Sequence, residues 1–208
     1  MVITQALLIR LDGRPGRDAD VENFLLSALP AVQREALTSA WFALRYGRGE
    51  YGIFTAFPTV DARDAHLADR TIRSMMDHSD ALFLRQPRIH RCAVLANKLA
   101  LPVTSMESVT KALMLSFRPR AGHILEVEQF LRDAKATVMH EPKTSAWFAL
   151  QLDDGHYGIF DVFPDTGGRF VHLTGHVPRE LAKHSLSLLG GMPDLDMINV
   201  LCSKLPAG

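Results

Sequence analysis

The sequence has little cysteine and no long apolar run. Its 208 residues contain only two cysteines, Cys92 and Cys202, and these form no C-x-x-C pair and no disulfide framework. No stretch reaches the 18 or so consecutive apolar residues that a transmembrane helix requires. We therefore expect reduced thiols in a cytoplasmic protein that has no membrane partner.

Charge of one sign is also lacking, since 23 Lys and Arg residues balance 23 Asp and Glu residues. A nucleic-acid-binding protein needs a basic surface, so we expect no nucleic-acid partner. The glycine patterns that hold a dinucleotide or a nucleotide phosphate are missing, as is the G-x-S-x-G elbow of hydrolases. These absences argue against nucleotide-dependent chemistry and serine hydrolysis.

The dominant positive feature is an internal repeat. Residues 38–58 read TSAWFALRYGRGEYGIFTAFP, and residues 144–164 read TSAWFALQLDDGHYGIFDVFP. An offset of 106 aligns Thr4–Leu99 with Thr110–Leu205 without a gap, and 38 of the 96 pairs are identical. A repeat of this length indicates a duplicated and fused domain. We expect domains at 1–100 and 107–208, joined by a linker at about 100–108.

Six elements are predicted in each half, in the same order. In the first half, apolar runs and turn signals predict strands, and apolar residues spaced three and four apart predict helices. Pro30 is expected to kink or end the first helix early. The predicted elements are the strand Thr4–Leu11, the helix Asp18–Glu35, the strands Thr38–Tyr46 and Tyr51–Phe57, a long helix Asp61–Phe83 capped by Thr59 or Asp61, and the strand Arg88–Leu99.

This β-α-β-β-α-β order is typical of a ferredoxin-like unit, an α+β fold with an antiparallel sheet and helices on one of its faces. The other face of each sheet must also be covered. Two fused copies can cover each other, which predicts a pseudo-dimer within one chain. The expected fold is a pair of tandem ferredoxin-like repeats that form an intramolecular α/β-barrel. A further homodimer is left open.

The strings TSAWFAL and YGIFDVFPD, followed by Arg169 and by His172 and Leu173, resemble the antibiotic biosynthesis monooxygenase domain family of the dimeric α/β-barrel superfamily. The resemblance covers essentially all of each half. It implies oxygenation of a small aromatic or quinol-type substrate by O₂ without a cofactor. Two other functions stay open, namely non-catalytic small-molecule or stress-related binding, and a scaffold that fills its own pocket.

Aromatic residues at identical positions are candidates for substrate binding. Trp41 and Trp147 could line a flat pocket, with Tyr51 and Tyr157 as part of its wall. The alternative is that both indoles are core residues.

The second predicted helix of each half carries a repeated set of histidine and arginine residues. His66 and His172 are the candidate general bases. The arginines that could hold a phenolate or carboxylate are Arg63, Arg73, Arg169 and Arg179. We expect the flanking arginines to lower the pKa of His66 and keep it neutral. The alternative is a solvated helix shoulder.

A metal site has weak support. His172 and His176 have the i, i+4 spacing that a zinc site can use, but no acidic or cysteine pattern completes a ligand set, and Arg70 replaces His176 in the first half. We expect no metal. The substrate and the number of working sites are not determined by the sequence.

Overall fold

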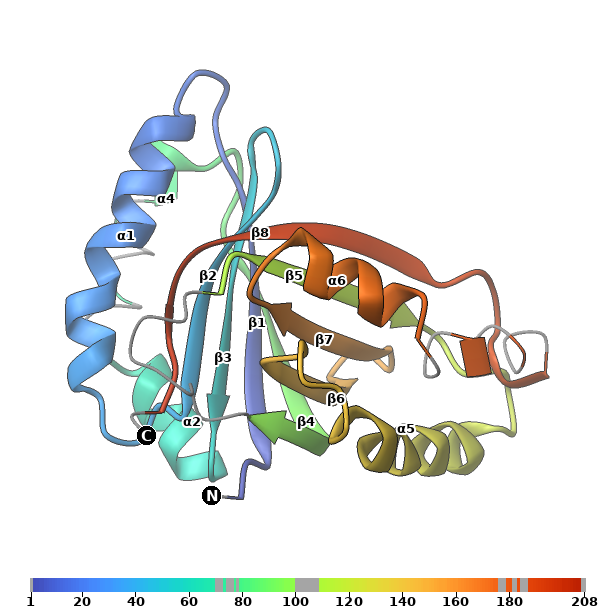
Figure 1. The fold of residues 1–208 in the computed structure, drawn as a ribbon. Helices are drawn as coiled ribbons and strands as arrows, with labels where there is room; N and C mark the ends of the chain where they lie inside the picture. The colour runs from blue at the N-terminus through green and yellow to red at the C-terminus, as the bar shows by residue number, and fades with distance from the viewer. Residues whose placement is uncertain are drawn as a thin grey trace. The chain divides into compact units, whose positions relative to one another are not determined.

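A computed structural model of the chain describes residues 2–69, 73, 77, 79–99, 109–175, 179–180, 183 and 187–206. The linker expected at about 100–108 lies outside these residues. The chain divides into two compact units: one contains residues 1–92 and 198–206, and the other contains residues 93–197 together with 207–208. Figure 1 labels the elements of both.

Each repeat has the predicted order of elements. The first consists of β1 (Gln5–Asp12), α1 (Asp18–Arg34), β2 (Ala40–Gly47), β3 (Glu50–Phe57), α2 (Val60–Leu67), α4 (Ser79–Leu82) and β4 (Arg88–Leu99). The second consists of β5 (Lys111–Phe117), α5 (Ile124–Val138), β6 (Ala146–Leu152), β7 (Tyr157–Phe163), α6 (Thr166–Leu173) and β8 (Asp194–Lys204).

The hydrogen-bonded strand order is β1-β3-β2-β8-β5-β7-β6-β4, which closes as a barrel. Within it, β4-β1-β3-β2 and β8-β5-β7-β6 are the two ferredoxin-like sheets. The predicted α+β class, with tandem repeats in one closed barrel, is therefore confirmed.

The last strand of each repeat contributes to both units. Arg88–Cys92 of β4 belong to the first unit, whereas the rest of that strand belongs to the second. In β8, residues 194–197 belong to the second unit and residues 198–204 belong to the first. The end of β8 pairs antiparallel with β2, from Trp41 with Lys204 to Arg45 with Asn199. Each unit is therefore completed by a strand segment from the other repeat.

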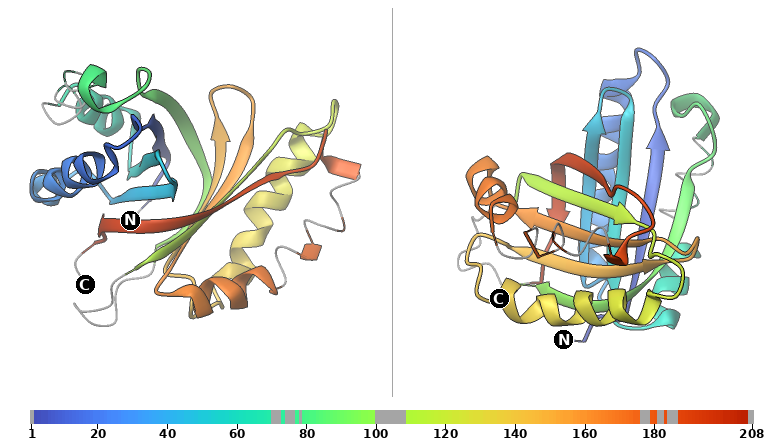
Figure 2. Two further views of the ribbon diagram at one scale, coloured as in Figure 1. Left: turned by 90° about the horizontal axis from the view of Figure 1, so that it is seen from above. Right: turned by 90° about the vertical axis from the view of Figure 1, so that its right-hand side faces the viewer.

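One face of each sheet packs against a helix of its own unit (Figure 2). In the first unit the apolar stripe of α1 meets the side chains of β2 and β3 that point the same way, because strand side chains alternate between faces. The core residues contributed by these elements are Val21, Leu25, Val32, Trp41, Ala43, Tyr51 and Ile53. The second unit repeats this core with Val127, Leu131, Ala134, Val138, Trp147, Ala149, Tyr157 and Ile159.

Two local predictions are wrong. Helix α1 continues past Pro30 to Arg34, so the alternative that the proline ends the helix early is wrong, while the alternative that it kinks the helix stays a prediction. The long helix expected at 61–83 is interrupted, because α2 ends at Leu67 and a turn at Ala68 and a bend at Asp69 follow it. The predicted cap at Thr59 is confirmed, since its side chain accepts a hydrogen bond from the amide of Ala62. Within the described residues, no helix is long and apolar enough to cross a membrane.

Two equivalent lysines connect the last strands to helix ends. Lys98 on β4 donates hydrogen bonds to the carbonyl groups of Val138, the last residue of α5, and of Glu141, just beyond it, at 2.9 and 2.6 Å. Lys204 on β8 donates to the carbonyl groups of Val32 and Glu35 at the end of α1. A cation suits these positions because the last carbonyl groups of a helix lack intrahelical partners and carry partial negative charge. Each lysine caps a helix of the other repeat.

We expect Lys98→Met to lower the free energy of unfolding by about 2 kcal/mol, because hydrogen bonds from a charged group contribute about 1.5–3 kcal/mol. The methionine preserves the aliphatic stem but leaves two carbonyl groups without this donor. Urea unfolding of the full chain measures the loss. Lys183→Met is the matched control, since Lys183 is exposed and pairs with Glu180 on the surface. Equal effects of the two changes would contradict a capping role for Lys98.

Candidate functional site

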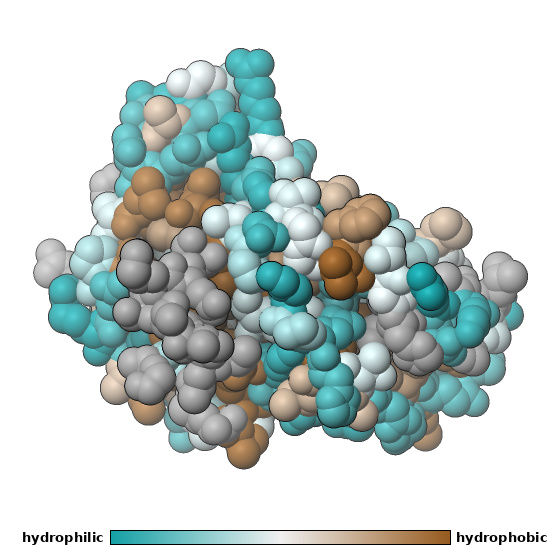
Figure 3. Space-filling view, in the orientation of Figure 1, coloured by the Kyte–Doolittle hydropathy of each residue, from teal (hydrophilic) through white to brown (hydrophobic). Residues whose placement is uncertain are grey.

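Helices α2 and α6 bury a histidine against the sheet. The side chains of His66 and His172 are only 2% and 4% exposed. On α6, the neighbouring Phe170 and Val171 are 66% and 59% exposed, and Figure 3 shows hydrophobic atoms over this helix. Large apolar residues usually occupy buried positions and histidine is intermediate, so this inverted placement indicates a specific need for the imidazole.

In the first unit, His66 is held by a glutamate from the end of α1. The Nδ1 atom of His66 lies 2.7 Å from Oε2 of Glu35. The same oxygen accepts a hydrogen bond of 2.6 Å from the hydroxyl group of Thr38. The ring of Phe57 packs on the imidazole, with centroids 5.1 Å apart. With Nδ1–H bonded to the carboxylate, Nε2 is the nitrogen that remains to exchange a proton.

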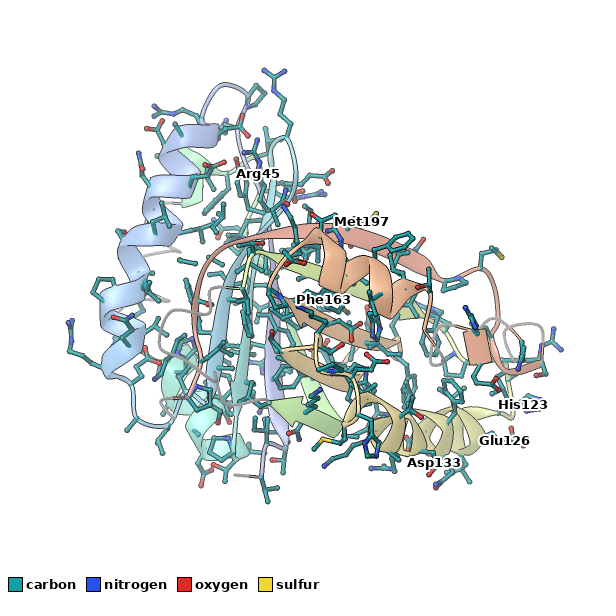
Figure 4. All side chains as sticks on the ribbon, in the orientation of Figure 1. Arg45, His123, Glu126, Asp133, Phe163 and Met197 are labelled. Carbon is teal, nitrogen blue, oxygen red and sulfur yellow. The ribbon has the colours of Figure 1, made fainter. Side chains whose placement is uncertain are left out.

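The second unit repeats this arrangement. The Nδ1 atom of His172 lies 2.6 Å from Oε2 of Glu141, which also accepts a hydrogen bond of 2.7 Å from Thr144. The ring of Phe163 lies 5.3 Å from the imidazole, and Figure 4 labels this phenylalanine on β7 beside α6. The two histidine–glutamate pairs therefore have the same geometry.

The environment of Nε2 differs between the repeats. Asp161 and Thr55 occupy equivalent positions, opposite Trp147 and Trp41 in the strand register. Asp161 is buried, and its Oδ2 atom lies 3.6 Å from Nε2 of His172. In the first repeat the corresponding side chain is the buried, neutral Thr55. Among the described residues, a carboxyl group therefore lies on each side of the imidazole in the second repeat but not in the first.

These carboxyl groups shift the proton affinities in the second unit. Burial raises the pKa of Asp161 to about 7, against the opposing effect of His172. Burial by itself would lower the pKa of His172, but Asp161 and Glu141 outweigh it and raise that pKa. Burial would likewise raise the pKa of Glu141, but the hydrogen bonds from His172 and Thr144 lower it.

The expected effect of the arginines on His66 stays a prediction, whereas the second unit can be described directly. The nearest charged partners of His172 are carboxylates, and its pKa is raised instead of lowered. In the first unit, Arg63 donates to the side chain of Gln5 at 2.8 Å and pairs with Asp64 at 2.9 Å, while His66 contacts Glu35. Both imidazoles are buried, so the two histidines do not lie on a solvated helix shoulder.

The other predicted arginines differ in their exposure. Arg169 is half-buried on α6, whereas Arg73 and Arg179 are exposed. Their suggested role toward a substrate stays a prediction. His176 lies outside the described residues, and the described residues contain no group of three or more His, Cys, Asp or Glu side chains that could hold a metal ion. Cys92 and Cys202 are both free thiols.

The aromatic candidates lie in the helix-facing cores. Trp41 and Trp147 are buried, as the core interpretation predicts. The hydroxyl group of Tyr51 donates to Asp18 on α1 at 2.7 Å, and that of Tyr157 donates to Glu128 on α5 at 2.9 Å. Burial and the neighbouring carboxylates raise the pKa of Tyr51, and they raise that of Tyr157 to about 12. Both phenols are therefore protonated at neutral pH.

Sequence reasoning missed Glu35 and Glu141. A signal was present, because this glutamate and the threonine three residues later are identical in the two repeats. This glutamate and threonine lie just beyond the first helix, where a carboxylate is usually expected to be exposed on the surface. Its partner, His66 or His172, is 31 residues further along the chain, so only the folded structure joins them.

No family model matches the sequence, and no curated protein matches it. Solved structures do share its fold. A protein from Fusobacterium nucleatum named "Putative monooxygenase" has a TM-score of 0.86 and 11% identity, over 100% of this chain and 96% of its own. An anthrone oxidase-like protein has a TM-score of 0.63 and 8% identity, over 97% and 92%.

A third structure, from Listeria monocytogenes, is described as a ferredoxin-fold protein related to antibiotic biosynthesis monooxygenases. It has a TM-score of 0.55 and 9% identity, over 95% of both chains. Because the sequence identities are only 8–11%, the similarity concerns the fold. At the level of the fold it confirms the resemblance found in the sequence.

We expect Asp161→Asn to flatten the pH dependence of stability. The pKa of Asp161 is about 7 in the folded protein against an ordinary value of 3.8, so the folded state binds this proton more tightly than the unfolded state. The resulting stability is fully present below about pH 4 and is lost as the pH rises towards 7. The raised pKa of His172 acts in the same direction at higher pH.

Urea unfolding at about pH 5 and about pH 8 should therefore show a loss in the parent that exceeds the loss in Asp161→Asn by about 1 kcal/mol or more, since one pKa unit corresponds to about 1.4 kcal/mol. Asp133→Asn is the control, because Asp133 is exposed on α5 (Figure 4). Parallel pH profiles for the parent and Asp161→Asn would show that this carboxyl group does not titrate between the two conditions.

Proposed function

Because the chain has the fold of monooxygenase-like, ferredoxin-fold proteins, we propose that it oxidises a small aromatic substrate with O₂ without a bound cofactor. The observation that carries this proposal is the buried histidine–glutamate pair, present twice with the same geometry. The name of the anthrone oxidase-like neighbour suggests the substrate class, a phenol or quinol whose anion is electron-rich.

The chemistry requires a base and dioxygen. Removal of a proton from a hydroxyl or methylene group of the substrate gives an anion that O₂ can oxidise. For an anthrone, one oxygen atom of O₂ becomes the new carbonyl oxygen. The other leaves as water with the two hydrogens of the methylene carbon. The protein contributes the base, its orientation and the exclusion of bulk water.

His66 is the stronger candidate for this base. Glu35 fixes the orientation of its ring through Nδ1, which leaves Nε2 to accept the proton. In the second repeat, Nε2 of His172 already faces Asp161 at 3.6 Å. A substrate would have to compete with that carboxyl group, so the first repeat is expected to carry most of the activity.

We expect His66→Gln to lower kcat for anthrone oxidation by about 10²–10⁴-fold, the usual contribution of a general base. His172→Gln is the matched variant and should lose much less. O₂ uptake with an anthrone substrate measures both rates, and thermal unfolding verifies that each variant is folded. Unchanged turnover in folded His66→Gln would show that this histidine is not the base.

Binding without turnover is the second candidate function. It is favoured by the burial of both imidazoles, whose side chains are at most 4% exposed. On this hypothesis the histidine–glutamate pairs stabilise the fold, and the protein binds an aromatic molecule elsewhere. A parent protein that binds an anthrone but consumes no O₂ would support this function over oxidation.

A further inference from the structure

Around His66, four buried polar atoms have no hydrogen-bond partner among the described protein atoms. They are Nε2 of His66, Oγ1 of Thr55, Oγ of Ser39 and Oε1 of Glu35. Three of these residues, His66, Thr55 and Ser39, are at most 5% exposed. Buried polar groups almost always have a partner, and a group of four such atoms requires an explanation.

The four atoms belong to one region of the structure. Glu35 is bonded to the ring of His66, and Thr38 joins that glutamate to the start of β2. Ser39 follows directly, and it shares a sheet face with Trp41, because side chains alternate along a strand. Trp41 is paired with Thr55 on β3. Thr55 and Phe57 are two residues apart on β3 and share this face, and the ring of Phe57 packs on the imidazole of His66. Ser39 and Thr55 therefore lie on the sheet face against which His66 packs.

The second repeat shows which group faces Nε2 in this position. There the carboxyl group of Asp161 lies 3.6 Å from Nε2 of His172. The surroundings are otherwise alike, since the histidine–glutamate distances are 2.7 and 2.6 Å in the two repeats. The histidine–phenylalanine ring distances are 5.1 and 5.3 Å. The difference between Thr55 and Asp161 is therefore a local one, because the other distances around the two histidines are nearly the same.

The threonine hydroxyl is attached directly to Cβ, whereas a carboxylate oxygen is one bond further away. With the same backbone register, Oγ1 of Thr55 is therefore expected to lie farther from Nε2 of His66 than the Asp161 carboxyl group lies from Nε2 of His172, and neither of the two first-unit atoms has a hydrogen-bond partner among the described residues. One bridging water would fill such a gap. A buried water needs two to four polar partners, and this region offers four.

We propose that His66, Thr55, Ser39 and Glu35 form a binding site for a single water molecule, which takes the place of the Asp161 carboxyl group in the second repeat. In the second repeat, the carboxyl group of Asp161 lies on the Nε2 side of the histidine instead. The water gives Nε2 of His66 a neutral partner that can donate or accept a proton, whereas Nε2 of His172 faces a fixed acid. This inference does not depend on the proposed oxidation.

Exchange of the differing residue between repeats tests the site. Thr55→Asp should displace the water, and Asp161→Thr should create a second site beside His172. Oxygen-17 relaxation dispersion of the full chain counts long-lived internal waters. The count should fall by one in Thr55→Asp and rise by one in Asp161→Thr. Since a new buried charge can prevent folding, Thr55→Asn, which is neutral and nearly the same size as Asp, serves as the second variant.

A crystal structure of the parent provides the direct measurement. The expected result is one ordered water within hydrogen-bonding distance of Nε2 of His66 and Oγ1 of Thr55, and none between His172 and Asp161. A direct hydrogen bond from His66 Nε2 to a protein group would overturn the proposal. So would an unchanged water count in folded Thr55→Asn.

Discussion

The sharing of the last strands is the constraint on which the rest of the structure depends. A ferredoxin-like repeat on its own ends at one strand edge, and an unpaired edge leaves a row of backbone groups without partners. Here, the end of β8 pairs with β2, and Lys204 caps α1 from that same strand. The end of α1 carries Glu35, which orients His66. Strand pairing, helix capping and the position of the imidazole are therefore linked in each unit.

Much of the fold could be predicted from sequence because the repeat and the local patterns agree. Apolar alternation and turn signals gave the strands, and the order β-α-β-β-α-β follows from them. The bounds of β4 were predicted without error, since Pro87 precedes the strand and its pattern is continuous. The long second helix was predicted wrongly, because a helical spacing of apolar residues does not reveal a turn at Ala68.

The site was predictable only in part. His66 and His172 could be chosen because they repeat at an offset of 106 residues. Their glutamate partners could not be predicted, since the spacing of residues along a helix places a histidine only relative to its own helix. This spacing indicated the nearby arginines but not the glutamates, which reach the imidazole from another element. The raised pKa of His172 depends on these carboxylates and could not be derived from the sequence of its own helix.

The fusion of the two repeats has a consequence for symmetry. In a dimer of identical subunits, every substitution appears in both copies, so a carboxyl group placed beside one histidine is placed beside the other. In a single chain the two positions are encoded separately. Asp161 lies beside one imidazole while Thr55 occupies the equivalent strand position in the other repeat, an asymmetry open to a fused chain but closed to a homodimer. Covalent linkage thus lets one half specialise while the other preserves the architecture.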